Sequence, residues 1–336
     1  MLDLLSASGV RGLRIKAEVP NVDVTINDYK EKAYALMKKN AKLNKLDVTI
    51  KNKPANVLLT ELNTYDYIDL DPFGTPVPFL DSAIKRLSLH SILAVTATDT
   101  SALCGAYPNA CLRKYGSKPL RNEFMHETAI RILIKKCQEV AAQYDVSLIP
   151  IFSHSSNHYV RVYLQKTSSA KKADAVLKQH GLILYCPDCC WRGTTTTPLV
   201  EKDSCPKCKA KLEWAGPIWL GELWDQKLVK RMRTLALWAD NNLDEKAILN
   251  IEKLGLDIKQ TKKFKLSKAT IKLISQIHKE MSIKTVGFYD LHVLAKKNKW
   301  KEVPRMDCYL SKTCTKTHFR LTGLRTKSLH PKTSTI

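Results

Sequence analysis

Near its start the sequence reads LDLLSASGVRG, at residues 2–12. An apolar run is followed by a loop of small residues and then by helical spacing, which predicts a strand, a turn and a helix. The alternation continues outward from there, with further strands predicted at 22–26, 48–50, 65–70 and 91–98, and helices at 10–19, 30–43, 77–87 and 120–144. Two last strands, at 146–152 and 159–164, are close enough in sequence to pair antiparallel. The pattern predicts an α/β fold, a doubly wound sheet with helices on both faces, over residues 1 to about 166.

The loop between the first strand and the first helix has the composition of a ligand-binding turn. The dinucleotide-binding pattern Gly-x-Gly-x-x-Gly is not met, because Ser6 and Ser8 stand near the positions of its first two glycines. A pyrophosphate site at the N-terminus of the helix is therefore not predicted, although Gly9 is present. A ligand without phosphates, such as S-adenosylmethionine, fits this loop better, and the carboxylate of Asp3 would attract its cationic groups. Asp28 follows the second strand, where an acid can accept hydrogen bonds from ribose hydroxyls. The alternative is a plain strand–helix turn.

A second motif, Asp71-Pro72-Phe73-Gly74, directly follows the strand predicted at 65–70. The carboxylate of Asp71 can accept one hydrogen of an amine, and the carbonyl of Pro72 can accept the other. Phe73 offers a face on which a planar base can stack. Two acceptors in this arrangement turn the nitrogen lone pair toward an electrophile, which predicts methylation of a nucleobase amine. The alternative is an ordinary Pro-Gly turn in which Asp71 caps the next helix.

The positive charge of the chain is concentrated in its C-terminal half. The 336 residues carry a net charge of +23, of which residues 1–165 contribute +5 and residues 166–336 contribute +18. This asymmetry favours a polyanionic partner, nucleic acid, and the alternative is a solvated Lys-rich surface. Residues 166–174 are predicted to form a linker or exposed turn. Helices with Lys on their polar faces are predicted around 225–241, 244–254, 267–280 and 285–298.

Four of the ten cysteines have the spacing of a metal site. The pairs Cys186-x2-Cys189 and Cys205-x2-Cys208 are separated by 15 residues, and two such knuckles supply four thiolates for a closed, structural Zn²⁺ site. Cys190 competes with Cys189, but the two-residue spacing favours Cys189. Cysteine use of this kind without a secretory signal predicts a reducing compartment, the cytoplasm. The sequence has no apolar run of the length that a membrane span requires.

Blocks in order along nearly the whole chain resemble the tRNA (guanine-26 N2) dimethyltransferases, which use S-adenosylmethionine. These blocks are residues 2–12, 27–28, 68–74, 95–99, 103–106, 216–221, 317–319 and 322–323. The resemblance implies a Rossmann-like class I methyltransferase domain at 1–176. It also implies a basic α+β tRNA-binding domain at 177–336, with the zinc ribbon at about 181–214. The implied reaction transfers one or two methyl groups to the exocyclic N2 of guanine 26, between the D and anticodon stems of tRNA.

The resemblance also implies roles for single residues. Asp71 would be the catalytic acceptor, with Pro72 and Phe73 shaping the base pocket. The cofactor would be held by Arg11, Asp28, Ala55 and Asn56, together with the loop residues Asp3, Ser6, Ser8 and Gly9. The tRNA would be contacted by Gly74, Thr317, His318, Phe319, Thr322 and Gly323.

Two features depart from the family's pattern. The family has a segment before the first strand, with an Asn-Arg-Asp motif whose Arg reaches the cofactor, and the present sequence begins at the strand. At Pro54 the family usually has an acid that binds the adenine amine, which leaves Ala55 and Asn56 for that contact. Three hypotheses are therefore kept: methylation of tRNA guanine 26, methylation of an exocyclic amine on another nucleic acid, and an inactive RNA-binding homologue. No membrane association and no obligate protein partner are expected.

Overall fold

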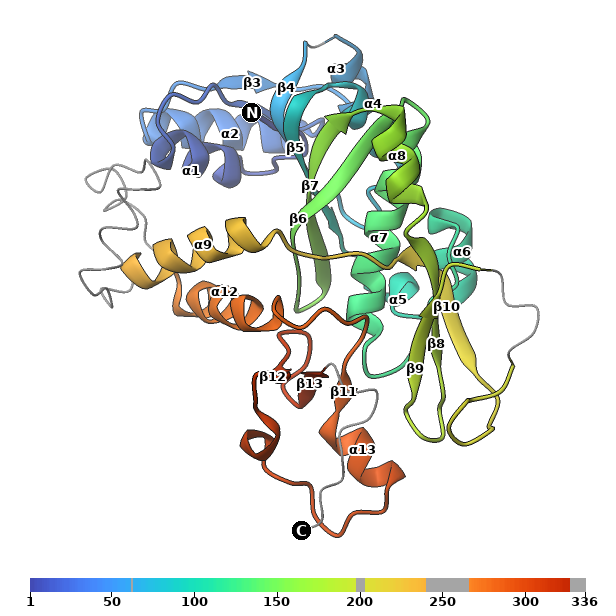
Figure 1. Ribbon diagram of the computed structural model, residues 1–336. Helices are drawn as coiled ribbons and strands as arrows, with labels where there is room; N and C mark the ends of the chain where they lie inside the picture. Colours follow the sequence, from blue (N-terminus) through green and yellow to red (C-terminus); the bar gives the residue numbers. More distant parts are fainter. Residues whose placement is uncertain (62, 198–202, 240–265, 327–336) are drawn as a thin grey trace. The chain divides into compact units, whose positions relative to one another are not determined.

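The computed structural model describes residues 1–61, 63–197, 203–239 and 266–326 (Figure 1). The chain divides into two compact units. Unit 1 contains residues 1–100, 133–153 and 157–178, and unit 2 contains residues 101–132, 154–156 and 179–336. Residues 101–132 group with unit 2 in this division, and the functional domains predicted at 1–176 and 177–336 stay a prediction.

Unit 1 is built on a seven-stranded sheet with the order β3-β2-β1-β4-β5-β7-β6. The first five strands pair in parallel, and β7 pairs antiparallel with β5. The predicted doubly wound α/β fold is therefore confirmed. The strands are β1 (Leu2–Asp3), β2 (Thr25–Asn27), β3 (Thr49–Lys51), β4 (Tyr65–Leu70), β5 (Leu87–Ala97), β6 (Val146–Ser156) and β7 (Tyr159–Ser168).

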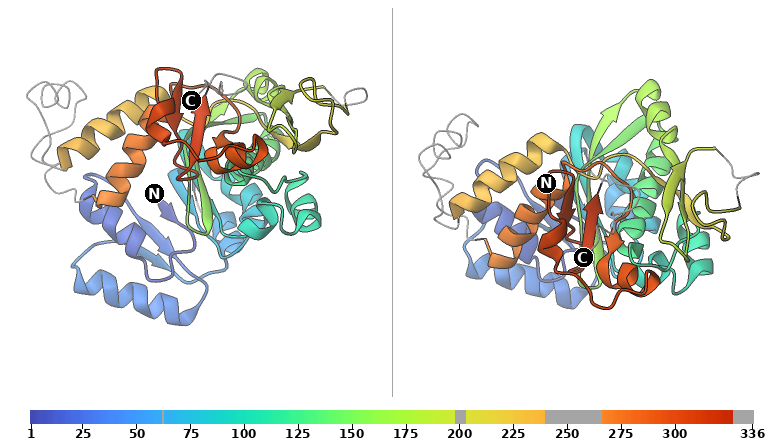
Figure 2. Two further views of the ribbon diagram at one scale, coloured as in Figure 1. Left: turned by 90° about the horizontal axis from the view of Figure 1, so that it is seen from below. Right: turned by 60° about the horizontal axis from the view of Figure 1, so that its bottom comes forward.

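The helices of the first half bury apolar side chains against this sheet. They are α1 (Val10–Glu18), α2 (Glu31–Leu43), α3 (Ala55–Glu61), α4 (Val77–Lys85) and α7 (Met125–Ala142), the last of which contributes residues to both units. Leu13 of α1 joins Met37 and Ala41 of α2, one helical turn apart, in a cluster with Ile26 of β2. Figures 1 and 2 show α1 and α2 side by side next to these strands.

The prediction of a linker at residues 166–174 is wrong. Strand β7 continues to Ser168, and helix α8 (Ala170–Leu177) begins almost at once. The backbone N–H of Lys172 donates to the Ser169 hydroxyl, which therefore caps the helix. Ala173 and Val176 of α8 are buried. This run of Ser, Ala and Lys residues therefore forms a capped helix, because Ala173 and Val176 on one face of it are buried.

Unit 2 contains two small sheets and several helices. One sheet has the order β10-β8-β9, from β8 (His180–Tyr185), β9 (Arg192–Thr195) and β10 (Glu213–Trp219). The other has the order β11-β13-β12, from β11 (Tyr289–Asp290), β12 (Cys314–Lys316) and β13 (Gly323–Thr326). The helices are α5 (Thr100–Leu103), α6 (Pro108–Tyr115), α9 (Gln226–Ala239), α12 (Lys268–Glu280), α13 (Leu291–Lys297) and the 3₁₀ helix η1 (Met306–Tyr309).

Three of the helices predicted for the C-terminal half have counterparts in unit 2. α9 and α12 match the predictions at 225–241 and 267–280, while the segment predicted at 285–298 forms β11 and then the shorter α13, capped by Asp290. The helix predicted at 244–254 lies outside the described residues. Within the part of the chain that the structure describes, no helix combines the length and the apolar character needed to cross a bilayer.

The order of the sheet in unit 1 sets the position of the candidate site. Strand order reverses between β1 and β4, which lie next to each other although two strands separate them in sequence. In doubly wound sheets, ligands bind beyond the carboxyl ends of the strands at such a reversal. The loops that follow β1 and β4 both begin at this edge, and they carry the two motifs found in the sequence.

Candidate active site and metal centre

The loop after β1 is shaped by two glycines. Gly9 has a φ of 77°, in the left-handed region that glycine adopts readily, and its N–H donates to the Ser6 carbonyl at 2.8 Å. At Gly12, an added Cβ would lie 2.3 Å from Cγ2 of Ile26 in β2. The absence of side chains lets the start of α1 approach the sheet closely. The loop therefore presents its backbone, and next to it Arg11, at the carboxyl edge.

Asp3, at the end of β1, is a buried acid that contacts the start of α1 through one of its two carboxylate oxygens. The residue is 1% exposed, and its Oδ2 accepts from the Gly12 N–H at 3.2 Å. Its other oxygen, Oδ1, is buried, and no group of the described residues donates a hydrogen bond to it. Burial, reinforced by the nearby Asp69 carboxylate, raises the pKa of Asp3 to about 6. A buried, unpaired carboxylate oxygen is costly, and a cationic ligand group would satisfy it.

Asp28 holds the other side of the loop from the end of β2. Its Oδ2 accepts from the Ala7 N–H and its Oδ1 from the Lys30 N–H, both at 3.0 Å. Each carboxylate oxygen can accept a further hydrogen bond, so these contacts leave capacity for ribose hydroxyls. The contacts orient the carboxylate at the edge of the sheet where the sequence predicted it.

The remaining predicted cofactor residues line or support the same edge. The Ser6 hydroxyl donates to the Asp3 carbonyl at 2.6 Å, and the Ser8 carbonyl accepts from Asn40. Ala55 is buried at the first position of α3, and Asn56 next to it is exposed and donates to the Pro78 carbonyl. Ser6 and Ser8 thus fix the conformation of the loop, while Ala55 and Asn56 lie at the N-terminus of a helix.

Asp71 is held at the end of β4 by an arginine. Arg11 donates through Nη1 to Oδ1 of Asp69 at 2.9 Å and through Nη2 to Oδ2 of Asp71 at 2.5 Å. Asp71 is partly exposed, and within the described residues nothing donates to its Oδ1. The pair of contacts fixes the orientation of the Asp71 carboxylate and leaves one oxygen available. Arg11, predicted as a cofactor residue, here binds the predicted catalytic carboxylate.

The sequence interpretation missed the buried half of this network. Asp69 is fully buried, and its Oδ2 accepts from Arg161 at 2.5 Å and from the Tyr67 hydroxyl at 3.0 Å. Burial opposes the charge of Arg161, but the adjacent Asp69 carboxylate raises the pKa of Arg161 above its ordinary value. The alternation of Asp69 and Asp71 was a signal, because residues two apart lie on one face of a strand. Arg161 is 92 residues away, and no local pattern identifies it.

The turn after β4 presents an aromatic ring to solvent. Phe73 is 95% exposed, whereas Pro72 before it is buried. Gly74 has a φ of 79°, and its N–H donates to the Thr98 hydroxyl at 2.6 Å. Thr98 donates its own N–H back to the Gly74 carbonyl at 3.0 Å. These two bonds hold the turn in place, and because the Phe73 ring is exposed, a planar base can stack on it.

The four predicted metal ligands converge in unit 2. The Sγ atoms of Cys186, Cys189, Cys205 and Cys208 all lie within 4.8 Å of one another. Two of the separations are 3.4 Å (Cys186–Cys208) and 3.6 Å (Cys189–Cys205), close to the roughly 3.8 Å expected between thiolates bound tetrahedrally to one Zn²⁺. The donor set fits zinc, and its four protein ligands leave no open position, which makes the site structural.

The two halves of this cysteine cluster have the same backbone construction. Each CxxC pair is followed by a residue with positive φ, Cys190 at 60° and Lys209 at 66°. The N–H of each of these residues donates to the carbonyl of the first cysteine in its pair, at 2.9 Å. Cys190 is therefore a turn residue outside the cluster, as the spacing predicted.

Of the predicted tRNA-contacting residues in the C-terminal part, Thr317, Phe319 and Gly323 are buried, and His318 and Thr322 are partly exposed. Thr317 and His318 both contact Glu280 of α12, through the threonine hydroxyl at 2.9 Å and through Nδ1 of the histidine at 2.8 Å. Phe319 stacks on Phe288 with ring centroids 6.0 Å apart, and at Gly323 a Cβ would lie 2.3 Å from Thr317. Thr322 donates to Asp290 at 2.5 Å. In this structure the segment holds unit 2 together, and its contact with tRNA stays a prediction.

Fold and site together define a class of protein. The strand order with an antiparallel β7, a loop of small residues after β1 and acids after β2 and β4 are the construction of a Rossmann-like, class I methyltransferase. A family model described as N2,N2-dimethylguanosine tRNA methyltransferase matches residues 1–332. The chain belongs to this family.

Known relatives agree with this membership. The tRNA (guanine(26)-N(2)/guanine(27)-N(2))-dimethyltransferase of Aquifex aeolicus is 39% identical over 331 residues, 96% of this chain and 78% of the relative. The tRNA (guanine(26)-N(2))-dimethyltransferase of Methanobrevibacter smithii is 36% identical over 340 residues, 97% of this chain and 80% of the relative. The solved structure of Trm1 from Pyrococcus horikoshii in complex with S-adenosyl-L-methionine is similar with a TM-score of 0.80. It is 33% identical, over 97% of this chain and 85% of that one.

Proposed function

We propose that this chain transfers methyl groups from S-adenosylmethionine to the exocyclic N2 of guanine 26 in tRNA. The family membership and the names of the relatives support the reaction and the substrate. The observation that carries the proposal is the turn after β4, where Asp71 has a free carboxylate oxygen next to an almost fully exposed Phe73. An amine acceptor beside a stacking surface is what a methyltransferase acting on a base requires.

The residues around the β1 loop fit the cofactor. S-adenosylmethionine supplies the methyl group when it is bound. The unpaired Oδ1 of Asp3 would accept a hydrogen bond from a cationic group, and the carboxylate of Asp28 would accept bonds from ribose hydroxyls. Ser6, Ser8 and Gly9 would shape the loop, and Ala55 and Asn56 would border the adenine.

The chain's own groups act on the guanine through the turn after β4. Oδ1 of Asp71 and the Pro72 carbonyl, which accepts no hydrogen bond within the described residues, would accept the two hydrogens of the N2 amine. This orients the nitrogen lone pair, and Asp71 stabilises the positive charge that develops on nitrogen and can take its proton. Arg11 keeps the carboxylate in place. Phe73 would stack on the base after it leaves the tRNA helix.

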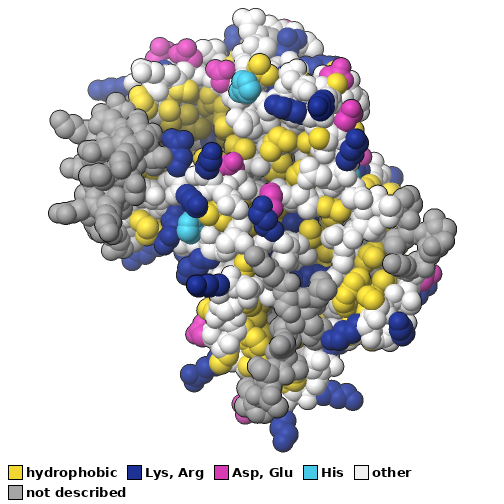
Figure 3. Space-filling view, in the orientation of Figure 1, with side chains coloured by type: hydrophobic (Ala, Val, Ile, Leu, Met, Phe, Trp, Pro, Cys, Tyr) yellow, Lys and Arg dark blue, Asp and Glu magenta, His cyan; other side chains and the backbone are white. Residues whose placement is uncertain are grey.

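The positive surface of unit 2 supports tRNA binding. On the face shown in Figure 3, Lys and Arg side chains gather over α9 and α12. Burial lowers the pKa of His278 in α12, and the nearby charges of Arg233 and Lys230 on α9 lower it further. A cluster of cations on two neighbouring helices attracts phosphates, so we assign tRNA binding to the basic C-terminal part, residues 177–336. The four zinc thiolates require a reducing compartment, for which we propose the cytoplasm.

The proposal is tested with two tRNA transcripts that differ only at position 26, guanine in one and adenine in the other. We expect incorporation of labelled methyl groups into the first and none into the second, with equal binding of both. An unmethylated DNA and a ribosomal RNA fragment serve as further substrates. Incorporation into the adenine-26 transcript, or into DNA or ribosomal RNA at the same rate, would contradict the assigned substrate.

A further inference from the structure

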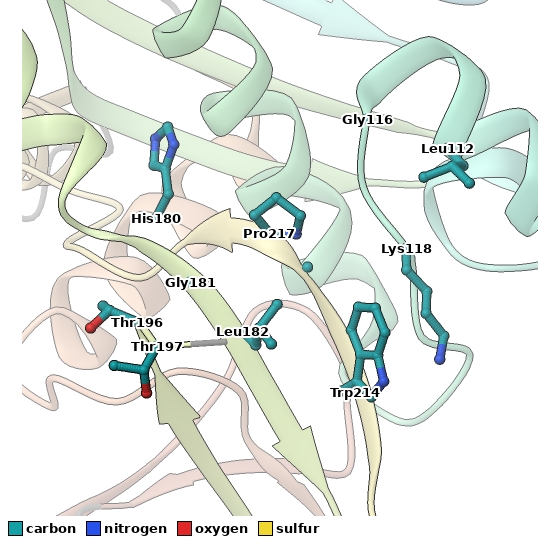
Figure 4. Close-up of a pocket in the computed structure, with 11 residues that line it drawn as sticks. Leu112, Gly116, Lys118, His180, Gly181, Leu182, Thr196, Thr197, Trp214 and Pro217 are labelled. Atoms are coloured by element: carbon teal, nitrogen blue, oxygen red, sulfur yellow. The ribbon is translucent and has the colours of Figure 1, made fainter. Parts of the chain in front are cut away.

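Unit 2 contains a cavity of about 510 Å³ that shares no residue with the site in unit 1 (Figure 4). This volume lies in the range of small-molecule binding pockets. Its walls come from β8, from β10, from the two residues that follow β9, and from α6 with the loop after it. Chemically distinctive side chains in the lining are Lys118, His180, Thr196, Thr197 and Trp214. None of these residues belongs to the candidate site described in unit 1.

Hydrogen bonds within unit 2 hold the walls of the cavity in place. Lys118 and Gly216 exchange two backbone hydrogen bonds, of 2.8 and 2.9 Å, which join the loop after α6 to β10. The Ser117 hydroxyl donates to the Pro217 carbonyl at 2.7 Å. At Gly181 in β8, an added Cβ would lie 2.3 Å from the Thr195 carbonyl oxygen at the end of β9. The backbones of these two strands therefore contact each other closely beside the cavity. These backbone contacts fix the positions of the cavity walls.

An aromatic ring and a cation lie together at one end of the cavity. The Trp214 side chain is partly open to solvent, and Nζ of Lys118 lies 4.2 Å from the centroid of its ring. Figure 4 shows the two side chains next to each other, with Thr196 and Thr197 toward the opposite side. Within the described residues the Thr196 hydroxyl makes no hydrogen bond, and the residue is exposed. The cavity therefore combines a flat stacking surface, a positive charge and a hydroxyl.

We propose that this cavity binds one unpaired nucleotide of the tRNA, with its base stacked on Trp214 and its phosphate beside Lys118. The proposal rests on the proposed function for the identity of the RNA. Stacking on an aromatic side chain accepts any base, and a lysine beside it neutralises the phosphate. A purely apolar ligand would leave the ammonium group of Lys118 without a partner of opposite charge. The net charge of +18 in residues 166–336 favours an RNA ligand over a neutral one.

The test compares tRNA binding by the full chain and by four variants, measured by filter binding at two salt concentrations. We expect Trp214→Ala to weaken binding about tenfold, because stacking on one aromatic side chain is lost. Trp214→Phe keeps a ring and is expected to keep most of the affinity. Lys118→Gln should lower the slope of log affinity against log salt by about 1. Tyr107→Ala, an exposed aromatic residue of unit 2 outside the cavity lining, is the matched control and should bind like the wild type.

Two measurements establish that the variants are folded: zinc content and S-adenosylmethionine binding, both expected at wild-type levels. Equal tRNA affinity of Trp214→Ala and wild type overturns the proposal, as does a loss in Trp214→Phe as large as that in Trp214→Ala. Nucleoside 5′-monophosphates are added in a further arm. Saturable binding of these that depends on Trp214, while tRNA affinity does not, assigns the cavity to a free nucleotide and also overturns it. Absence of methyl transfer by the wild type, with Trp214-dependent tRNA binding intact, refutes the proposed function and leaves the cavity assignment standing.

Discussion

At the residue scale, two carboxylates at the end of β4 share one arginine, and this sharing determines which oxygen a base can reach. Asp69 is buried and its oxygens are occupied by Arg11, Arg161 and Tyr67. Asp71, two residues on, gives only Oδ2 to Arg11. Since the arginine is anchored on the buried acid, the carboxylate of Asp71 is held through Oδ2, and within the described residues Oδ1 accepts no hydrogen bond. The role we propose for Asp71 is therefore contact with the substrate, and for Arg11 and Asp69 it is to position the Asp71 carboxylate.

Replacing Asp71 by Asn removes the negative charge but keeps the size and one acceptor. We expect kcat for tRNA methylation to fall about a hundredfold, since one preorganised contact to developing charge is weakened. Binding of S-adenosylmethionine, measured by calorimetry, should not change. The matched control is Asp66→Asn, an exposed acid on the same strand, which should retain full activity. Full turnover in Asp71→Asn with cofactor still bound would contradict the role assigned to Asp71.

The raised pKa of Asp3, about 6, predicts a pH-dependent cofactor affinity. Below that pH the carboxyl group is protonated in the folded protein, and above it the ionised group attracts a cationic ligand. We expect the affinity for S-adenosylmethionine to rise about tenfold between pH 5 and pH 7, as the carboxyl group ionises. Calorimetry across this range measures it. In Asp3→Asn the profile should be flat between the same limits, and an unchanged profile in that variant would refute the prediction.

The raised pKa of Asp3 affects the stability of the cofactor-free protein in the opposite direction: stability falls as pH rises, whereas cofactor affinity increases. The folded-state pKa is raised above the ordinary value of 3.8, so the unfolded state loses its proton first as pH rises. The contribution of Asp3 is thus fully favourable below pH 4 and is lost between about pH 4 and pH 6. A buried acid that costs stability at neutral pH is characteristic of a ligand site.

At the element scale, the strands and helices of the first half were predictable because the spacing of apolar residues in the sequence matches the side chains that the fold buries. The runs at 65–70 and 30–43 became β4 and α2 nearly at their predicted limits. Residues 166–174 were not predictable from composition, because the helix depends on the Ser169 cap and on tertiary burial of two small side chains. The cysteine spacing predicted all four converging ligands, since two knuckles of fixed length leave little freedom.

The cysteine module predicts one zinc ion per chain with a structural role. Cys205→Ser removes one thiolate, and we expect loss of the bound metal and of the fold of the β8–β9–β10 sheet around it. Metal analysis and protease sensitivity of this region measure both effects. Cys190→Ser is the control, since Cys190 lies outside the cluster, and it should retain one zinc per chain. Zinc retained in Cys205→Ser, or lost in Cys190→Ser, would contradict the ligand assignment.

At the scale of the whole molecule, unit 2 is held by a buried ionic network between distant parts of the sequence. Glu127 contacts Arg131 and also Arg325, which is 198 residues away, and Arg325 in turn contacts Glu280. All four side chains are nearly inaccessible to solvent. Burial works against ionisation of Glu280, but His318 and then Arg325 lower its pKa below the ordinary value. No sequence pattern predicts such a network, because its members are individually unremarkable and meet only in the fold.

Breaking this network should destabilise unit 2. Glu280→Gln leaves Arg325 and His318 with weaker partners in a buried position, and we expect a loss of about 3–5 kcal/mol in the free energy of unfolding of that unit. Binding of S-adenosylmethionine by unit 1 should survive. Glu222→Gln, whose ion pair with Lys284 is about half exposed, is the control and should cost no more than about 1 kcal/mol. Denaturant unfolding measures both, and equal losses would show that the network is not a stabilising feature.

The most direct measurement of the central claim uses a tRNA with inosine in place of guanine 26. Inosine lacks the exocyclic N2 amine and is otherwise the same base, so every contact except the one to Asp71 and Pro72 is kept. Nucleoside mass spectrometry after reaction with S-adenosylmethionine should find N2-methylguanosine or N2,N2-dimethylguanosine in the guanine-26 tRNA and no methylation of the inosine-26 tRNA, with both RNAs bound. Methylation of inosine 26 at the rate of guanine 26 would mean that the methyl group goes to another atom, and it would contradict the account.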